Sequence, residues 1–114
     1  MIRAKMLNKR ATIERVTVPE LRDELGAAVV LWETYLENIP VMVQALSANE
    51  RAMLGSTGVD VSHRLFMNPL SEALTERDRM KIDDEIYDIH YVDDVAGMGH
   101  HWEVATSKQI DGGG

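Results

Sequence analysis

A run of strictly alternating residues limits the fold of this chain more than any other feature. Residues 86–92 read I-Y-D-I-H-Y-V, so that Tyr87, Ile89 and Tyr91 share one face of a strand and the remaining residues share the other. Residues 79–82 form a preceding strand, and an acidic turn at residues 83–85 joins the two into a hairpin. This hairpin predicts an antiparallel β structure.

Several further segments have the β-branched and apolar content of short strands. Residues 27–36 fit a helix or a strand by periodicity, but Val29, Val30 and Trp32 favour extended structure. Pro40 is expected at the start or on an edge of its strand, because proline donates no ladder hydrogen bond. Together these segments predict a mainly β chain, a small antiparallel barrel or sandwich with at most short helices. The expected strands span residues 10–18, 27–36, 39–46, 61–67 and 100–107.

One long connection, residues 47–59, interrupts the strand pattern. Gly55 and Gly58 permit wide backbone excursions there, while residues 49–54 could form a short helix. Its few large apolar side chains, Met53 and Leu54, give it little reason to pack on its own barrel. Because connections of this length in small domains are usually functional or disordered, we interpret it as a long, flexible inserted loop.

Length and charge narrow the class of protein. The 114 residues suffice for a single domain, residues 1–114, with a flexible tail expected at residues 108–114. The net charge of -7 disfavours tight nucleic-acid binding, and the absence of cysteine excludes disulfides and thiol chemistry. The longest apolar run, residues 27–32, is too short for a bilayer, and residues 1–6 lack the apolar stretch of a signal peptide, so no membrane partner is expected.

Candidate metal ligands and acid–base groups form only weak patterns. The best set combines His90, His100 and His101 with Asp93 and Asp94, but adjacent residues on a strand point to opposite faces, which separates His100 from His101. The turn acids are expected to be solvated and to form the turn. The sequence contains no nucleophile elbow, phosphate-cradling glycine loop or HExxH motif. We therefore expect no enzyme, no cofactor and no metal.

The largest side chains have ordinary structural interpretations. Trp32 and Trp102 are expected in the barrel core or in a subunit interface, because large aromatic side chains dominate both kinds of burial. Most of the methionines are expected to be adaptable packing residues. Met53 and Met98 differ because they lie in expected loops, where they suggest contacts with a partner.

A series of segments in the same order resembles the phage head–tail joining, or head-closure (stopper), family of small connector proteins. No single segment is a catalytic signature, and the resemblance lies in the co-linear set, which covers nearly the whole chain. The segments are MLNKRATIER at residues 6–15, WETYLENIPVMVQALS at 32–47, SHRLF at 62–66, ERDRMKIDDEIYDIHYVDD at 76–94 and GHHWEV at 99–104. The chain departs from the family pattern at residues 83–85, where a glycine is commoner.

The resemblance implies a structural protein of the virion neck that assembles in the host bacterium's cytoplasm. It implies a small β-barrel that joins with copies of itself into a ring, a hexamer or dodecamer. The head side would contact a portal or adaptor protein, and the tail side a tail terminator or tail tube protein. Packaged double-stranded DNA would pass through without sequence-specific binding, which agrees with the acidic charge of the chain, because a basic surface would trap polyphosphate.

The resemblance also implies that residues 47–59 reach into the channel and hold the DNA. Met53 and Leu54 of neighbouring copies would then bury one another, and Glu50 and Arg51 would pair between neighbours. The turn with Met98, Gly99 and His100 is a candidate assembly surface. The expected channel residues are Asn49, Glu50, Arg51, Met53, Leu54, Gly55 and Gly58.

Two other functions stay open. A free-standing β-barrel could act as an adaptor that binds a host protein through an exposed strand edge. A small metal-dependent hydrolase could use His90, Asp93 and His100.

Overall fold

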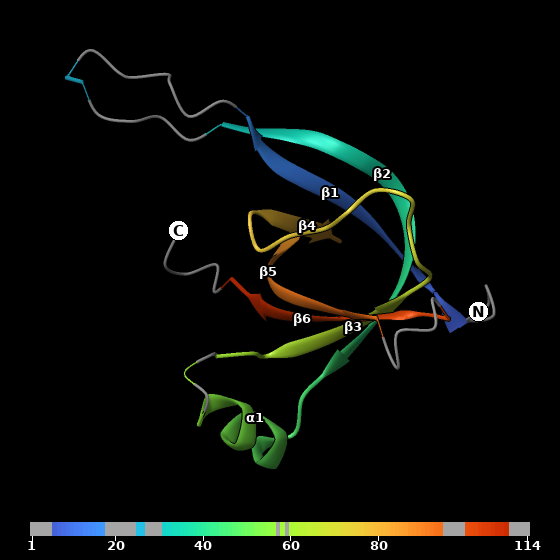
Figure 1. Cartoon of the computed structure of the whole chain (residues 1–114), viewed down its shortest axis with the longest axis vertical. Coiled ribbons are helices and arrows are strands. Elements are labelled where there is room, and N and C mark those ends of the chain that lie inside the picture. Colours follow the sequence, from blue (N-terminus) through green and yellow to red (C-terminus); the bar gives the residue numbers. More distant parts are fainter. Residues whose placement is uncertain are drawn as a thin grey trace.

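Six antiparallel strands close into a barrel in the part of the chain that the computed structural model describes, residues 6–17, 25–26, 31–56, 58, 60–94 and 100–109 (Figure 1). Around the barrel the order is β1-β2-β3-β6-β5-β4. One helix, α1, lies between β2 and β3. The predicted class, a mainly β chain with a short helix, is confirmed. The elements are β1 (Lys9–Thr17), β2 (Leu31–Ala45), α1 (Ala48–Gly55), β3 (His63–Met67), β4 (Asp78–Ile82), β5 (Glu85–Asp94) and β6 (Trp102–Lys108).

The barrel is filled by alternate residues of its strands, because successive side chains of a strand point to opposite faces. Met67 and Met80 are fully buried, which confirms their predicted role as packing residues, and Trp102 packs partly buried against the same core. The connection between β3 and β4 adds Leu74 and, partly buried, Leu70. The buried strand residues of this core are Ala11, Ile13, Val41, Leu65, Met67, Met80, Ile82, Tyr87, Ile89 and Val104.

Strand β2 is one strand where the sequence predicted two. The expected break falls at Asn38, which adopts a positive φ of 58°, and the register with β1 shifts nearby. Irregularities of this kind absorb extra residues without ending the ladder, and Asn tolerates the left-handed conformation. Pro40 lies inside β2 but where the strand pairs with β1 alone, since pairing with β3 begins at Val41.

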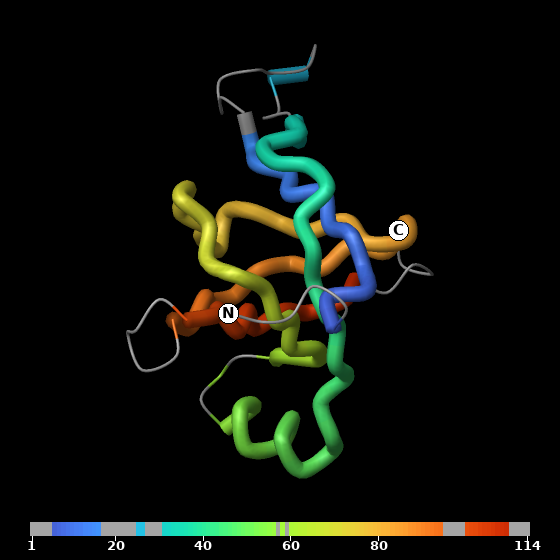
Figure 2. Tube along the Cα trace, turned by 90° about the vertical axis from the view of Figure 1, so that its right-hand side faces the viewer, coloured from blue at the N-terminus to red at the C-terminus, as the bar shows by residue number. Residues whose placement is uncertain are grey.

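The first two strands extend beyond the closed part of the barrel. Pairing of β1 with β4 stops at Arg15 and Asp78, whereas β1 and β2 stay paired to Thr17 and Leu31. The ends of β1 and β2 therefore form a two-stranded ribbon that projects from the barrel (Figure 1). Figure 2 shows this ribbon and α1 at opposite ends of the molecule.

Strand β5 corrects the alternation predicted for residues 86–92. Tyr87 and Ile89 are buried, but the register with β6 shifts between Ile89 and Tyr91, and Tyr91 is 46% exposed. The irregularity returns Val92 to the core side, where it packs partly buried. The expectation that Tyr91 shares the face of Tyr87 and Ile89 is wrong, because one extra residue in a bulge reverses the faces that follow.

The acidic hairpin turn is tighter than predicted. Asp83 and Asp84 both have positive φ, 51° and 66°, and Glu85 already pairs with Ile82 as the first residue of β5. Two central residues with positive φ form the hairpin turn that most often contains glycine, and Asp is among the residues that tolerate it. This explains how the turn forms without the glycine that the family commonly has.

Replacing Asp84 with glycine is expected to raise the free energy of unfolding by about 0.5–1 kcal/mol, because glycine adopts positive φ without strain. The side chain lost is almost fully exposed and lies 4.0 Å from Lys81, too far to contribute much. Urea denaturation measures the change. The control is Asp83→Gly, which also removes the 2.7 Å ion pair with Lys9 and should gain less. A lower denaturation midpoint for Asp84→Gly than for the parent chain would contradict this account of the turn.

Candidate functional site

The predicted channel loop contains a regular helix. Ser47 caps α1: its hydroxyl accepts a hydrogen bond from the Glu50 backbone N–H at 3.2 Å, and the Glu50 carboxylate accepts one from the Ser47 N–H at 3.3 Å. This reciprocal arrangement is a capping box, which fixes where a helix starts. The short helix expected at residues 49–54 is confirmed and extends from Ala48 to Gly55.

Helix α1 is fastened to the outside of the barrel, which corrects the expectation that this loop does not pack. Leu54 contacts a small cluster formed by Leu46, Val61 and Ala105, separate from the main core. Arg64 of β3 lies between Glu50, at 3.5 Å, and Glu103 of β6, also at 3.5 Å. One apolar side chain and a few ion pairs therefore hold the helix.

Each charged residue proposed to pair between neighbouring copies has a partner within the chain. Glu50 pairs with Arg64, and Arg51 lies 3.3 Å from Asp60. These ion pairs are exposed to solvent, so each contributes little to the stability of the fold. In the single chain Glu50 and Arg51 therefore both have intrachain partners, and their pairing with a neighbouring copy stays a prediction.

The remaining channel residues face solvent. Met53 is 74% exposed, and Asn49, Gly55 and Gly58 are also exposed. Gly58 has a φ of 89°, which requires glycine, and its N–H donates to the Gly55 carbonyl. In the single chain Leu54 contacts the barrel, whereas Met53 faces solvent.

Replacing Leu54 with alanine should loosen α1 without unfolding the barrel, because Leu54 packs only on the outer cluster. We expect hydrogen exchange of the α1 amides to accelerate about tenfold, while exchange in β3 and β6 stays unchanged. The matched control is Met53→Ala, which alters an exposed side chain of the same helix and should leave exchange as it is. Equal acceleration in β6 would mean that Leu54 supports the barrel itself.

The second predicted surface lies mostly outside the described residues. Met98 and Gly99 are among the residues not described, whereas His100 is exposed just before β6. His100 and His101 precede the strand, so the opposite-face rule does not separate them, and their Nδ1 atoms lie 3.1 Å apart. His101 Nε2 also lies 3.3 Å from Glu103.

The candidate metal ligands named in the sequence analysis do not lie together. His90 Nε2 contacts the Ser107 hydroxyl at 2.6 Å, and Asp93 and Asp94 lie in β5 rather than in the expected turn. Within the described ranges, no group of three or more His, Asp or Glu residues is placed to hold a metal ion. The acids of residues 83–85 pair instead with lysines, namely Lys9, Lys81 and Lys108.

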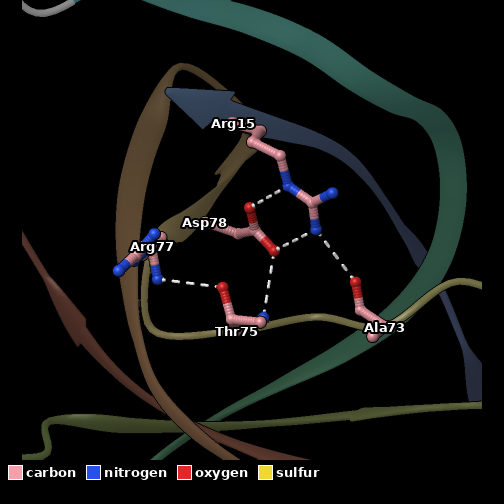
Figure 3. A network of polar contacts seen from close by, with 5 residues as sticks. All are labelled: Arg15, Ala73, Thr75, Arg77 and Asp78. Atoms are coloured by element: carbon pink, nitrogen blue, oxygen red, sulfur yellow. Dashed lines mark hydrogen bonds and ion pairs between the residues drawn. The ribbon is translucent and has the colours of Figure 1, made fainter. Parts of the chain in front are cut away.

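An ion pair with a buried carboxylate lies at one end of the core, and no sequence pattern indicated it (Figure 3). The Asp78 side chain is fully buried and accepts hydrogen bonds from Arg15 Nε at 2.7 Å, Arg15 Nη2 at 2.9 Å and the Thr75 N–H at 3.0 Å. Arg15 Nη2 also donates to the Ala73 carbonyl, and its guanidinium stacks 3.7 Å from the centre of the Tyr35 ring. The hydrogen bond to Asp78 raises the pKa of Arg15 further above its usual value.

Among the clefts on the described surface, one lies beside the ribbon and another beside α1. One, of about 490 Å³, lies between the ribbon and the connection before β4 and is lined by Arg15, Val16, Tyr35, Ala73, Thr75 and Arg77. The other, of about 450 Å³, lies beside α1 and includes Arg51, Asp60, His63, Glu85 and Lys108. There desolvation, with Lys108 and Arg51 nearby, lowers the pKa of His63 below 6.5, so neutral His63 is favoured.

Fold and site together define a small β-barrel with an externally attached helix and no assembled catalytic or metal centre among the described residues. A family model, Phage head completion protein, matches residues 2–108. The chain belongs to the phage head completion protein family, which confirms the resemblance seen in the sequence. This is a family of structural proteins of the phage particle, so the chain is a virion-associated protein.

A solved structure supports the fold independently. The solution structure of protein SF1141 from Shigella flexneri 2a is 18% identical and covers 93% of this chain and 96% of its own, with a TM-score of 0.69. At this identity the likeness concerns the fold alone. The comparison with curated proteins gives no match. Among the described residues, the only helix is far too short to span a bilayer.

Proposed function

We propose that this chain is the head-closure, or stopper, connector of a tailed phage. Copies form a ring between the portal or adaptor and the tail, retain the packaged DNA and provide the surface on which the tail docks. The observation that carries the proposal is the family match over residues 2–108, combined with a helix that lies outside the barrel core. One small barrel cannot enclose a duplex, so the function requires several copies.

The proposed gate is the segment around α1. It is held by Leu54 and by exposed ion pairs, while Met53 faces solvent, so the helix can reorient at a small cost to the barrel. In the ring, Met53 side chains from several copies would converge near the axis and exclude water together. Symmetry multiplies such weak contacts. Negative charge on the chain keeps DNA from adhering to the passage.

Host-protein binding through a strand edge is less well supported. From Trp32 to Pro40 the edge of β2 opposite β1 pairs with no strand among the described residues. That edge carries exposed Glu33 and Glu37, the irregular Asn38 and a proline, and such features discourage strand addition. The hydrolase alternative gains no support from the dispersed positions of His90, His100 and Asp93.

The test is complementation of heads assembled without this chain. We expect such heads to package DNA, lose it on storage and fail to bind tails, and the purified chain should restore both properties. Nuclease sensitivity of the released DNA and infectivity after adding tails are the measurements. Heads that hold their DNA and bind tails equally well without the chain would overturn the proposal.

A further inference from the structure

Two histidines directly before β6 bring one ring nitrogen of each together. The Nδ1 atoms of His100 and His101 lie 3.1 Å apart, and the two ring planes are inclined by 82°. Zinc binds imidazole nitrogen at about 2.0–2.1 Å, so two ligand nitrogens of a tetrahedral site lie about 3.3 Å apart, and two at a right angle about 2.9 Å apart. The observed separation falls between these values, so the two nitrogens are spaced as neighbouring ligands of one ion.

The hydrogen bonds of His101 leave its Nδ1 lone pair directed at His100. His101 Nε2 lies 3.3 Å from a carboxylate oxygen of Glu103, and a carboxylate only accepts, so the proton of the neutral ring is on Nε2. Nδ1 then accepts from the Nδ1–H of His100. Moving that proton of His100 to its own Nε2 changes no charge and presents two lone pairs to an ion. Because His100 is exposed, water can accept a hydrogen bond from that Nε2.

Glu103 holds the His101 ring as the outer carboxylate of a metal site does. A histidine that ligates a metal usually donates its other ring N–H to a carboxylate or a carbonyl, which fixes the ring and makes the ligand more basic. The second oxygen of Glu103 lies 3.5 Å from Arg64 Nε, which keeps the carboxylate in place. The centre of the Phe66 ring lies 6.5 Å from that of His101, whose side chain is 22% exposed. His101 is therefore held in position before any ion binds.

The other two histidines of the chain lack this arrangement. His63 and His90 each contact a serine hydroxyl with one ring nitrogen, at 2.8 Å and 2.6 Å. The chain has four histidines, all of them within the described ranges, and only the pair before β6 brings two ring nitrogens together. The charge around the pair favours a cation, because the net charge is -7 and Asp93 of β5 is the register partner of Glu103.

We propose that His100 and His101 bind one zinc ion, or another divalent cation that prefers imidazole, through their two Nδ1 atoms. Copper(II) and nickel(II) share this preference, whereas magnesium and calcium prefer oxygen ligands. Two protein nitrogens do not make a complete centre, so water fills the remaining positions and the ion exchanges readily. The site needs neither a ring nor a catalytic role, so it goes beyond the proposed function.

The test is a titration of the purified chain with zinc chloride, followed by the ring proton signals of its four histidines in NMR spectra. The signals of His100 and His101 should shift together along one saturating curve, and those of His63 and His90 should stay in place. His100→Ala should weaken zinc binding at least about tenfold, and Glu103→Ala, which removes the outer carboxylate, about tenfold. The matched control is His90→Ala, which removes an imidazole elsewhere and should leave the affinity unchanged.

Three results would overturn the inference. One is the absence of a saturating shift in the His100 and His101 signals. Another is zinc binding by His100→Ala as tight as by the parent chain, because the ion would then lie elsewhere on the acidic surface. The third is an equal response to magnesium chloride, which would show that negative charge alone attracts the ion. Unchanged affinity in Glu103→Ala would refute the positioning role of Glu103. The proposed function stands apart from all of these results, because the titration needs neither heads nor a ring.

Discussion

Replacing Asp78 with alanine is expected to lower the free energy of unfolding by about 3 kcal/mol, the largest effect of any single substitution considered. The variant leaves Arg15 Nε, Arg15 Nη2 and the Thr75 N–H without their acceptor at the end of the core. An unpaired buried donor costs the full desolvation penalty, and a cation that loses its partner costs more. Arg15 keeps access to water, with 37% of its side chain exposed. We therefore expect a loss at the lower end of the range that is typical when one partner of a buried ion pair is removed.

Urea denaturation of the purified chain measures this loss. Asp78→Asn retains one acceptor and the shape of the side chain, and should recover part of the stability. Asp88→Ala is the matched control: among the described residues, this carboxylate of β5 accepts only from the exposed Gln109 side chain, and its removal should cost less than about 1 kcal/mol. Equal losses for Asp78→Ala and Asp88→Ala would show that the Arg15–Asp78 pair does not hold the end of the barrel.

Replacing residues 49–57 with a short glycine linker is expected to leave the barrel folded and the ring formed but to let packaged DNA leak from heads. None of the described residues of this segment belongs to the main core, and its loss removes the packing of Leu54 on the outer cluster and the exposed ion pairs of Glu50 and Arg51. Leakage is measured as nuclease-sensitive DNA released over time. We expect most particles to be emptied, against few for the parent.

The control for this experiment is Leu54→Ala, which loosens α1 but retains Met53 and the length of the segment. Particles carrying it should retain DNA nearly as well as the parent. If the glycine-linker particles retain DNA equally well, residues 47–59 are not the gate, and another component of the neck closes the channel.

The strand content was predictable because it depends on local composition. β-branched runs and the alternation at residues 86–92 identified β1, β3, β5 and β6 to within a few residues. Bulges were not predictable, because they depend on how two strands fit together: the positive φ of Asn38 joined two expected strands, and the shift after Ile89 reversed Tyr91.

The candidate site likewise has features that the local sequence predicts and features that it does not. The start of α1 had a local signal, Ser47 followed three residues later by Glu50, and the capping box confirms its meaning. The packing of Leu54 against the cluster that includes Ala105 joins segments far apart in the chain, as does the pair of Arg15 with Asp78. Contacts of this kind form when the barrel closes, as when β1 pairs with β4 and brings Arg15 beside Asp78. No local sequence pattern predicts them.

A cryo-electron map of the phage neck tests the central claim most directly. The account predicts a ring of these barrels between the portal or adaptor and the tail, with the α1 segment directed at the axis and Met53 nearest to it. A map in which barrels of this chain are absent from the neck, or form a ring whose α1 helices point away from the channel, would contradict it.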